Sequence, residues 1–214
     1  QHAYISNFED FNKDNLGDMI NLDRLSIFNK WSMHRPNNKK FTLFAKYFYE
    51  DRRNGVEAYM RDRAYRSLRG DTAIYGESIY TQRFELMGTY ELQTREHFRV
   101  DYSFSMHDQD SYYGADQYVA NQYIAYANFI WNRQFGQHDI LAGLTSRYQY
   151  YDDNTVATLD TNGVNQADNQ FIPALWVQDE WNVKPNKFSL LGGMRLDYFP
   201  AHGLIPSPRL SMRY

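Results

Sequence analysis

The side chains that perform acid–base, nucleophilic or metal chemistry are scattered along this sequence. Four of the six histidines, His97, His107, His138 and His202, include no pair spaced four residues apart, the arrangement that binds zinc on a helix. Asp179 and Glu180 are adjacent, so in a strand their carboxylates point to opposite faces and cannot act on one substrate as an acid–base pair. The sequence therefore predicts a protein that is not an enzyme and that needs no cofactor.

An aromatic segment is a candidate ligand-binding loop. Residues 108–118 hold Tyr112 and Tyr113 beside Gly114, an aromatic pair that is expected to sit on a mobile support. Aromatic loop tips suit flat or sugar-like ligands, and anchoring at a membrane interface is the alternative. Tyr150 and Tyr151, at the edge of the next polar segment, are candidates for the same binding surface.

A basic segment is the second candidate. "MRDRAYRSLRGD" (60–71) carries four arginines, and Arg66 and Arg69 are the predicted ligand-binding residues among them. Guanidinium groups bind carboxylates and phosphates, so the cluster fits an anionic chelate or a lipopolysaccharide phosphate. Pairing of these arginines with Asp62 and Asp71 inside the loop is the alternative.

An acidic segment, "YDDNTVATLDTNGVNQADNQ" (151–170), contains oxygen donors of the kind that Ca²⁺ prefers. The weak calcium candidates are Asp152, Asp153, Asp160, Asn162 and Asp168. The spacing of an EF-hand and its closing glutamate are missing, so a solvated polar loop is expected and no metal site is predicted.

Charge and composition restrict the class of protein. A formal net charge of -3 gives no reason to expect nucleic acid as a partner, and the absence of cysteine excludes disulfides and thiolate metal sites. No apolar run is long enough for a membrane-spanning helix. Strands of a membrane barrel need only about 9 to 11 alternating residues, so such a barrel is compatible with this sequence.

Alternation with a period of two residues is the main structural signal. In "LLGGMRLDYF" (190–199), Leu190, Met194 and Tyr198 share one face while Arg195 and Asp197 share the other. Asp179 breaks the rule, because it shares the apolar face of its strand. The expected strands, with a weakly defined first one, are 2–10, 24–33, 41–50, 83–92, 98–107, 118–132, 139–150, 174–183, 190–199 and 208–214.

The connections between these strands are expected to alternate in length. Residues 35–40, 93–97, 135–138 and 184–187 are short and rich in turn formers, whereas 54–76, 107–117 and 152–170 are long and polar. Outer-membrane barrels have tight turns at one rim and long loops at the other. The sequence therefore predicts an all-β, antiparallel, up-and-down transmembrane β-barrel, with the apolar faces toward lipid and the charged faces toward a hydrated lumen.

The carboxyl-terminal part resembles the barrel of TonB-dependent outer-membrane receptors. The matching residues are Gln178 to Trp181, then Gly193 with Arg195 and Asp197, and then Ser207 to Arg209, in the order that this family shows. Upstream, "IFNKWSMHR" and "RGDTAIYGESIYTQRFELMGTY" look like Bacteroidetes-type members, close to receptors for metal chelates and cobalamin.

The resemblance implies a barrel of about 22 strands whose lumen is closed by a plug. Residues 1–214 would supply roughly ten of those strands and no plug domain. It implies a receptor in the outer membrane of a Gram-negative bacterium that contacts outer-membrane lipid and imports cobalamin, a ferric siderophore or haem. Its energy would come from the TonB–ExbB–ExbD complex, through parts absent here. A glycan importer that works with a surface lipoprotein, and a soluble all-β carbohydrate-binding or adhesion module, are the alternatives.

Overall fold

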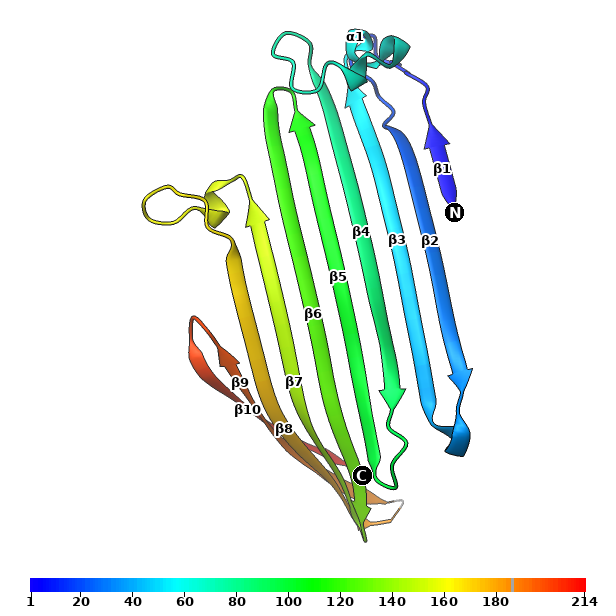
Figure 1. The fold of residues 1–214 in the computed structure, drawn as a ribbon, viewed down its shortest axis with the longest axis vertical. Coiled ribbons are helices and arrows are strands. Elements are labelled where there is room, and N and C mark those ends of the chain that lie inside the picture. The colour runs from blue at the N-terminus through cyan, green and yellow to red at the C-terminus, as the bar shows by residue number, and fades with distance from the viewer. Residues whose placement is uncertain (186) are drawn as a thin grey trace.

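The chain folds into one antiparallel sheet of ten strands, and each strand pairs with the next in the sequence (Figure 1). This computed structural model describes residues 1–185 and 187–214. The strands are β1 (His2–Ile5), β2 (Asn21–His34), β3 (Lys40–Gly55), β4 (Gly76–Glu91), β5 (His97–Tyr113), β6 (Asp116–Phe135), β7 (His138–Asp153), β8 (Asp168–Lys184), β9 (Phe188–Phe199) and β10 (Gly203–Arg213). The prediction of an all-β, up-and-down architecture is confirmed.

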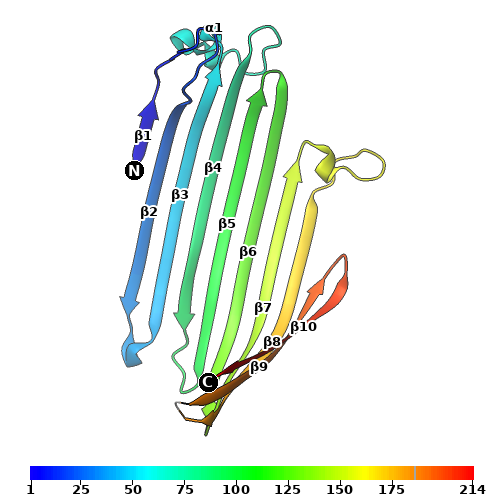
Figure 2. The same ribbon diagram turned by 180° about the vertical axis from the view of Figure 1, so that it is seen from behind.

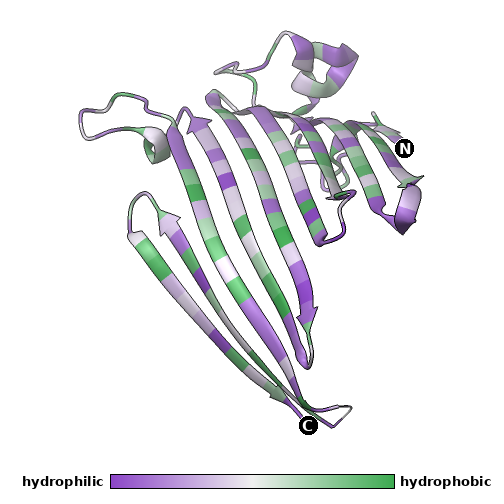
Figure 3. Ribbon diagram, turned by 60° about the horizontal axis from the view of Figure 1, so that its bottom comes forward, coloured by the Kyte–Doolittle hydropathy of each residue, from purple (hydrophilic) through white to green (hydrophobic). Residues whose placement is uncertain are grey.

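The register between neighbouring strands aligns their apolar residues on one side of the sheet and their polar residues on the other. On one side, which we call the apolar face, Trp131, Ala142, Val177, Met194 and Pro208 form a continuous row from β6 to β10. Figure 3 shows the result as bands of opposite hydropathy along the strands. Because successive side chains point to opposite sides, one continuous register turns ten amphipathic strands into a sheet with two chemically different faces.

The opposite side, which we call the polar face, is held together by hydrogen bonds between neighbouring strands. Thr42, Thr89, Asp101, Asn128 and Thr145 form one row across β3 to β7. The Thr89 hydroxyl donates to Asp101 at 2.8 Å, and the Thr145 hydroxyl donates to Asn128 at 3.0 Å. These pairs satisfy polar groups that the sheet itself leaves free.

The sheet curls, and β8, β9 and β10 turn away from the plane of the earlier strands in both views (Figures 1 and 2). Within the described residues β1 pairs only with β2, and β10 pairs only with β9. No second sheet covers the apolar face in this part of the chain, and Leu144 and Leu175 are 54% and 60% exposed. Within the described residues, the alternative of two packed sheets with a core between them, as in a soluble module, does not form.

Connections at one end of the sheet, which we call the short-turn end, are tight as predicted. They join β2 to β3 through the 3-10 turn η1 (Pro36–Asn38), and β4 to β5, β6 to β7 and β8 to β9 through a few residues each. At the other end, which we call the loop end, the connections between β3 and β4 and between β7 and β8 are long. The first contains α1 (Glu57–Met60) and the 3-10 helix η2 (Arg61–Arg66), and the second contains η3 (Val156–Thr158).

The prediction of a third long loop at 107–117 is wrong. Strand β5 continues to Tyr113 and β6 starts at Asp116, so only a two-residue turn joins them, with Gly114 at φ 63°. Here the two strands extend beyond the part of the sheet that has an apolar face, so side chains on both faces can be polar without a desolvation cost. Hydropathy therefore gave no sign of where these two strands end.

The loop between β3 and β4 contains the compact hydrophobic cluster of the described structure. Tyr59, Met60 and Tyr65 are buried. They pack against Val56, Leu68 and Ile74 of the same loop and against Phe8 from the connection between β1 and β2. Burial raises the pKa of the Tyr59 phenol to about 12. We call residues 56–75 the cap, because they fold onto the apolar-face side of β3 to β5 at the loop end. No helix in the described ranges is both long and apolar enough to cross a membrane.

Candidate ligand-binding surface

Charged side chains of the polar face are paired with one another along and across the strands. Lys46 and Glu85 lie 3.3 Å apart on β3 and β4, Arg24 pairs with Glu50 on β2 and β3, and Arg195 pairs with Asp197 along β9 at 2.7 Å. Such partly exposed pairs are stable in contact with water, whereas one charge in hydrocarbon costs about 2 to 4 kcal/mol for a cation at the bilayer midplane. The polar face is thus suited to a hydrated interior.

A groove opens on the polar face near the carboxyl-terminal edge. Its walls include Trp176, Gln178, Gly193, Arg195 and Arg209, and its volume is about 440 Å³. Strands β8, β9 and β10 each contribute, so the groove exists only after the three have paired. We call it the Trp176 groove.

Two contacts fix the position of the Trp176 indole. Its Nε1 donates to the side-chain oxygen of Asn128 at 3.2 Å, and its ring covers Gly143 on the neighbouring strand. A Cβ at position 143 would lie 2.4 Å from the ring, so only glycine leaves room for it. The close approach of an aromatic side chain to a strand glycine keeps the indole flat on the sheet.

The groove offers groups that can bind a ligand. Arg195 donates to both oxygens of Asp197, which fixes its guanidinium at the edge of the groove. Arg209 makes no ion pair within the described ranges, so its charge is available to a ligand. An aromatic plane, an amide and a free guanidinium are suited to an anionic or oxygen-rich ligand.

Arg69, predicted to bind a ligand, is used inside the protein. Its guanidinium pairs with Asp110 at 3.1 Å and lies between the rings of Tyr80 and Tyr112, at 4.1 and 4.9 Å from their centroids. The structure therefore brings the predicted residues Arg69 and Tyr112 together, but on the apolar-face side. The alternative partners Asp62 and Asp71 were wrong for Arg69, since its partner comes from β5. Arg66 is exposed at the end of η2.

The predicted aromatic pairs do not act as pairs. Tyr112 and Tyr113 are neighbours in β5 and therefore point to opposite faces, with Tyr113 43% exposed. Their expected placement in a mobile loop is corrected to a strand. Tyr150 and Tyr151 in β7 are divided in the same way. A role of these four tyrosines, of Arg66 and of Arg69 in binding a ligand stays a prediction.

Tyr151 is part of a hydrogen-bond network that supports the loop between β7 and β8. Its hydroxyl donates to Asp153 at 2.8 Å and lies 3.2 Å from the Tyr118 hydroxyl. Asp153 also accepts from the hydroxyls of Thr155 and Thr158. On the other face, the Tyr150 hydroxyl donates to Asp152 at 3.3 Å.

The carboxylates of the calcium candidates accept hydrogen bonds from groups of their own segment. Asp160 accepts hydrogen bonds from the backbone N–H groups of Asn162 and Val164, which lower the pKa of its carboxyl. Asp168 accepts from Gln170. Within the described ranges no three histidine or acidic side chains come together as a metal-binding group. Calcium binding stays the weaker alternative for this loop.

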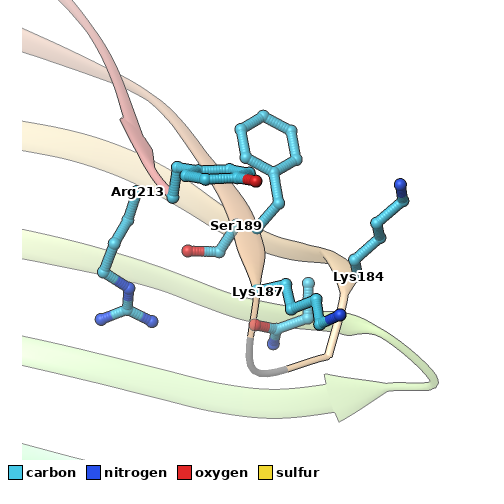
Figure 4. Close-up of a pocket in the computed structure, with 7 residues that line it drawn as sticks. Lys184, Lys187, Ser189 and Arg213 are labelled. Atoms are coloured by element: carbon cyan, nitrogen blue, oxygen red, sulfur yellow. The ribbon is translucent and has the colours of Figure 1, made fainter.

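A second cavity lies at the short-turn end, away from every predicted site residue. It has a volume of about 310 Å³ and is lined by Lys184, Lys187, Ser189 and Arg213, among others (Figure 4). Arg213 also donates to Glu180 at 3.2 Å. Neither this basic cavity nor the Trp176 groove was expected. For the groove, the usable sign in the sequence was Gly143, which leaves room for the indole of Trp176.

Comparisons with known proteins show the fold. No protein-family model matches the chain, and no curated protein matches it significantly. A mutant of the ferric enterobactin receptor PfeA from Pseudomonas aeruginosa is 14% identical and has a TM-score of 0.61, with 97% of this chain and 33% of that chain covered. PfeA in complex with BCV-L6 is 16% identical, with a TM-score of 0.59 and coverages of 98% and 34%.

The siderophore receptor PirA from Acinetobacter baumannii is similar as well, at 10% identity and a TM-score of 0.52, with 90% of this chain and 31% of that chain covered. The chain has the fold of a receptor barrel wall. It spans about a third of the length of these receptors. At such low identity the likeness concerns the strands and their order, and it carries no ligand over to this chain.

Proposed function

We propose that this chain is part of the barrel of an outer-membrane receptor that binds a scarce nutrient and imports it. The observation that carries the proposal is the combination of one up-and-down sheet, two chemically distinct faces and similarity to ferric siderophore receptors over nearly the whole chain. Import by such a receptor consists of binding and gating.

Placement in a membrane is supported by the exposure of the apolar face. Leu175, Val177 and Met194 are 60%, 49% and 45% exposed in the middle of their strands. Water would be a poor solvent for so continuous an apolar surface, and hydrocarbon is a good one. Fractionation of cells that express the full-length protein tests this. Recovery in the outer-membrane fraction is expected, and a monodisperse protein in detergent-free buffer would refute the proposal.

The cargo we propose is an iron chelate of the siderophore class, with cobalamin and haem as the other nutrients to test. Support comes from the similar receptors, which are receptors for ferric enterobactin and for a siderophore, and from the free guanidinium and indole of the Trp176 groove. A deletion strain should lose growth when one ferric siderophore is the sole iron source. Loss of growth only on limiting cobalamin, haem or a glycan would assign that cargo instead.

Energy from the TonB–ExbB–ExbD complex belongs to the same proposal and would act through parts of the protein beyond this chain. Growth on the cargo should then require both the receptor and a functional TonB complex. If uptake proceeded unchanged without that complex, the protein would be a passive channel, which would contradict the proposed active transport.

A further inference from the structure

Asp179 is an acidic residue on the apolar face. The sheet register places it in a row with Arg133, Ile140, Gly192 and Leu210. On this face one more row, which contains His138 and Trp181, lies between this row and the short-turn end. Its neighbour Glu180 points to the polar face, where it pairs with Arg213. Position 179 therefore puts a carboxylate where the proposed function puts lipid.

The surroundings of Asp179 leave its charge incompletely compensated. Oδ2 lies 2.7 Å from Nδ1 of His138, whose ring stacks on Trp181 with centroids 5.5 Å apart. Oδ1 is enclosed and has no hydrogen-bond partner within the described part of the chain. The side chain as a whole is 40% exposed, so the accessible part lies on the Oδ2 side. A carboxylate oxygen can accept about two hydrogen bonds, and the accessible Oδ2 has only His138 as a partner, so Oδ2 can accept one more.

Aromatic and charged side chains mark this level of the sheet as a membrane–water interface. Trp181 is 40% exposed, and Arg133 pairs with Glu96 at 3.1 Å beside Trp131. Aromatic girdles occupy the height of the lipid headgroups on membrane barrels. On the same face but further from the short-turn end, the exposed Val177 and Met194 lie where acyl chains would be.

There is also space beside the carboxylate. Gly192 is directly opposite Asp179 on β9, and a Cβ built at Gly192 would meet no atom within 4 Å. Its neighbours on the same face, Leu190 and Met194, carry full side chains. The sheet surface is therefore lowered next to Asp179, with room for a small polar group between two apolar side chains.

We propose that Asp179, His138 and the gap at Gly192 bind the headgroup of an aminophospholipid, with its primary ammonium on the Asp179 carboxylate. A primary ammonium has three hydrogen-bond donors and can use the free capacity of the carboxylate, whereas a quaternary ammonium has none. An anionic headgroup would be repelled by the carboxylate. The inference rests on the proposed membrane location and adds a lipid specificity to it.

The test uses the full-length protein in nanodiscs that contain equal amounts of phosphatidylethanolamine and phosphatidylcholine. Native mass spectrometry then measures the ratio of the two lipids retained on the protein. One charge-assisted hydrogen bond at an exposed site should give a preference of about fivefold for phosphatidylethanolamine. Asp179→Asn should remove the preference. Glu180→Gln, which neutralises the adjacent carboxylate on the other face, should leave it unchanged.

The possible results separate this inference from the proposed function. A protein that inserts into nanodiscs but retains both lipids equally, or an Asp179→Asn variant that keeps the preference, would overturn the headgroup site alone. A protein that does not insert would contradict the membrane location itself. Soluble glycerophosphoethanolamine carries the same phosphodiester and ammonium without acyl chains, so efficient competition by it would overturn the assignment to a lipid, and failure to compete supports it.

Discussion

Replacement of Gly143 by alanine tests whether the Trp176 indole is fixed by close contact with the neighbouring strand. The added Cβ would lie 2.4 Å from two ring carbons of Trp176 and 2.6 Å from Nε1. Ordinary contacts between such atoms are about 3.5 to 4.0 Å, so the ring must move by more than about 1 Å. That movement would also break the hydrogen bond from Nε1 to Asn128.

The expected loss of stability follows from these two effects. Overpacking by one methyl group costs about 1 to 3 kcal/mol, and the lost hydrogen bond costs about 0.5 to 1.5 kcal/mol. Because the two effects share one displacement they are not additive, and we expect about 2 kcal/mol. The groove should lose its aromatic wall at the same time, so binding of the cargo should weaken.

The assay is urea unfolding of the full-length protein in detergent micelles, followed by tryptophan fluorescence. Gly192→Ala is the matched control, because its Cβ meets no atom within 4 Å, and it should change stability by less than about 0.5 kcal/mol. In a Trp176→Ala background the Gly143→Ala substitution should become nearly neutral. An equal cost of Gly143→Ala with and without the indole would refute the proposed contact.

Three further predictions concern the loop end. Arg69→Ala removes the stacking on two tyrosines and the pair with Asp110, so the cap should loosen by about 1 to 2 kcal/mol and its proteolysis should accelerate, whereas the exposed Arg66→Ala should change neither. Asn154→Ala removes hydrogen bonds of 2.8 Å to the Val119 N–H and the Gln117 carbonyl, and hydrogen exchange at the Val119 amide should become faster; unchanged exchange would contradict the contact. The pKa of Asp160 is lowered in the folded loop, so its stabilisation is complete above the ordinary value of about 3.9 and is lost as pH falls through the folded value. Proteolysis of residues 154–167 should therefore rise below about pH 4, and Asp160→Asn should remove that dependence.

The strands were predictable because their signal is local. Alternation along "LLGGMRLDYF" depends only on side chains two residues apart, and β9 forms where the alternation indicates. The end of β5 was not predictable, because the residues near Tyr113 are polar on both faces and extend past the apolar band. Strand pairing with β4 and β6, which is a non-local property, decides that these residues are a strand.

The partners of the candidate site residues were not predictable for the same reason. Arg69 was expected to bind a ligand or to pair with Asp62 and Asp71, yet its partner is Asp110, 41 residues further along the chain. Tyr112 and Tyr113 were grouped because they are adjacent in sequence, although adjacency in a strand separates them onto two faces. Trp176 was not selected at all, since its groove is made by residues of three strands.

The sequence by itself determined that the strands are amphipathic, that the connections at the short-turn end are tight, and that Asp179 breaks the apolar pattern. These properties follow from side-chain chemistry at fixed spacing along one chain. Only the tertiary structure decided that Trp176 covers Gly143 and that Asp179 lies beside His138 and the gap at Gly192. Such neighbours are set by the register between strands, and register depends on the turns and on every pairing across the sheet together.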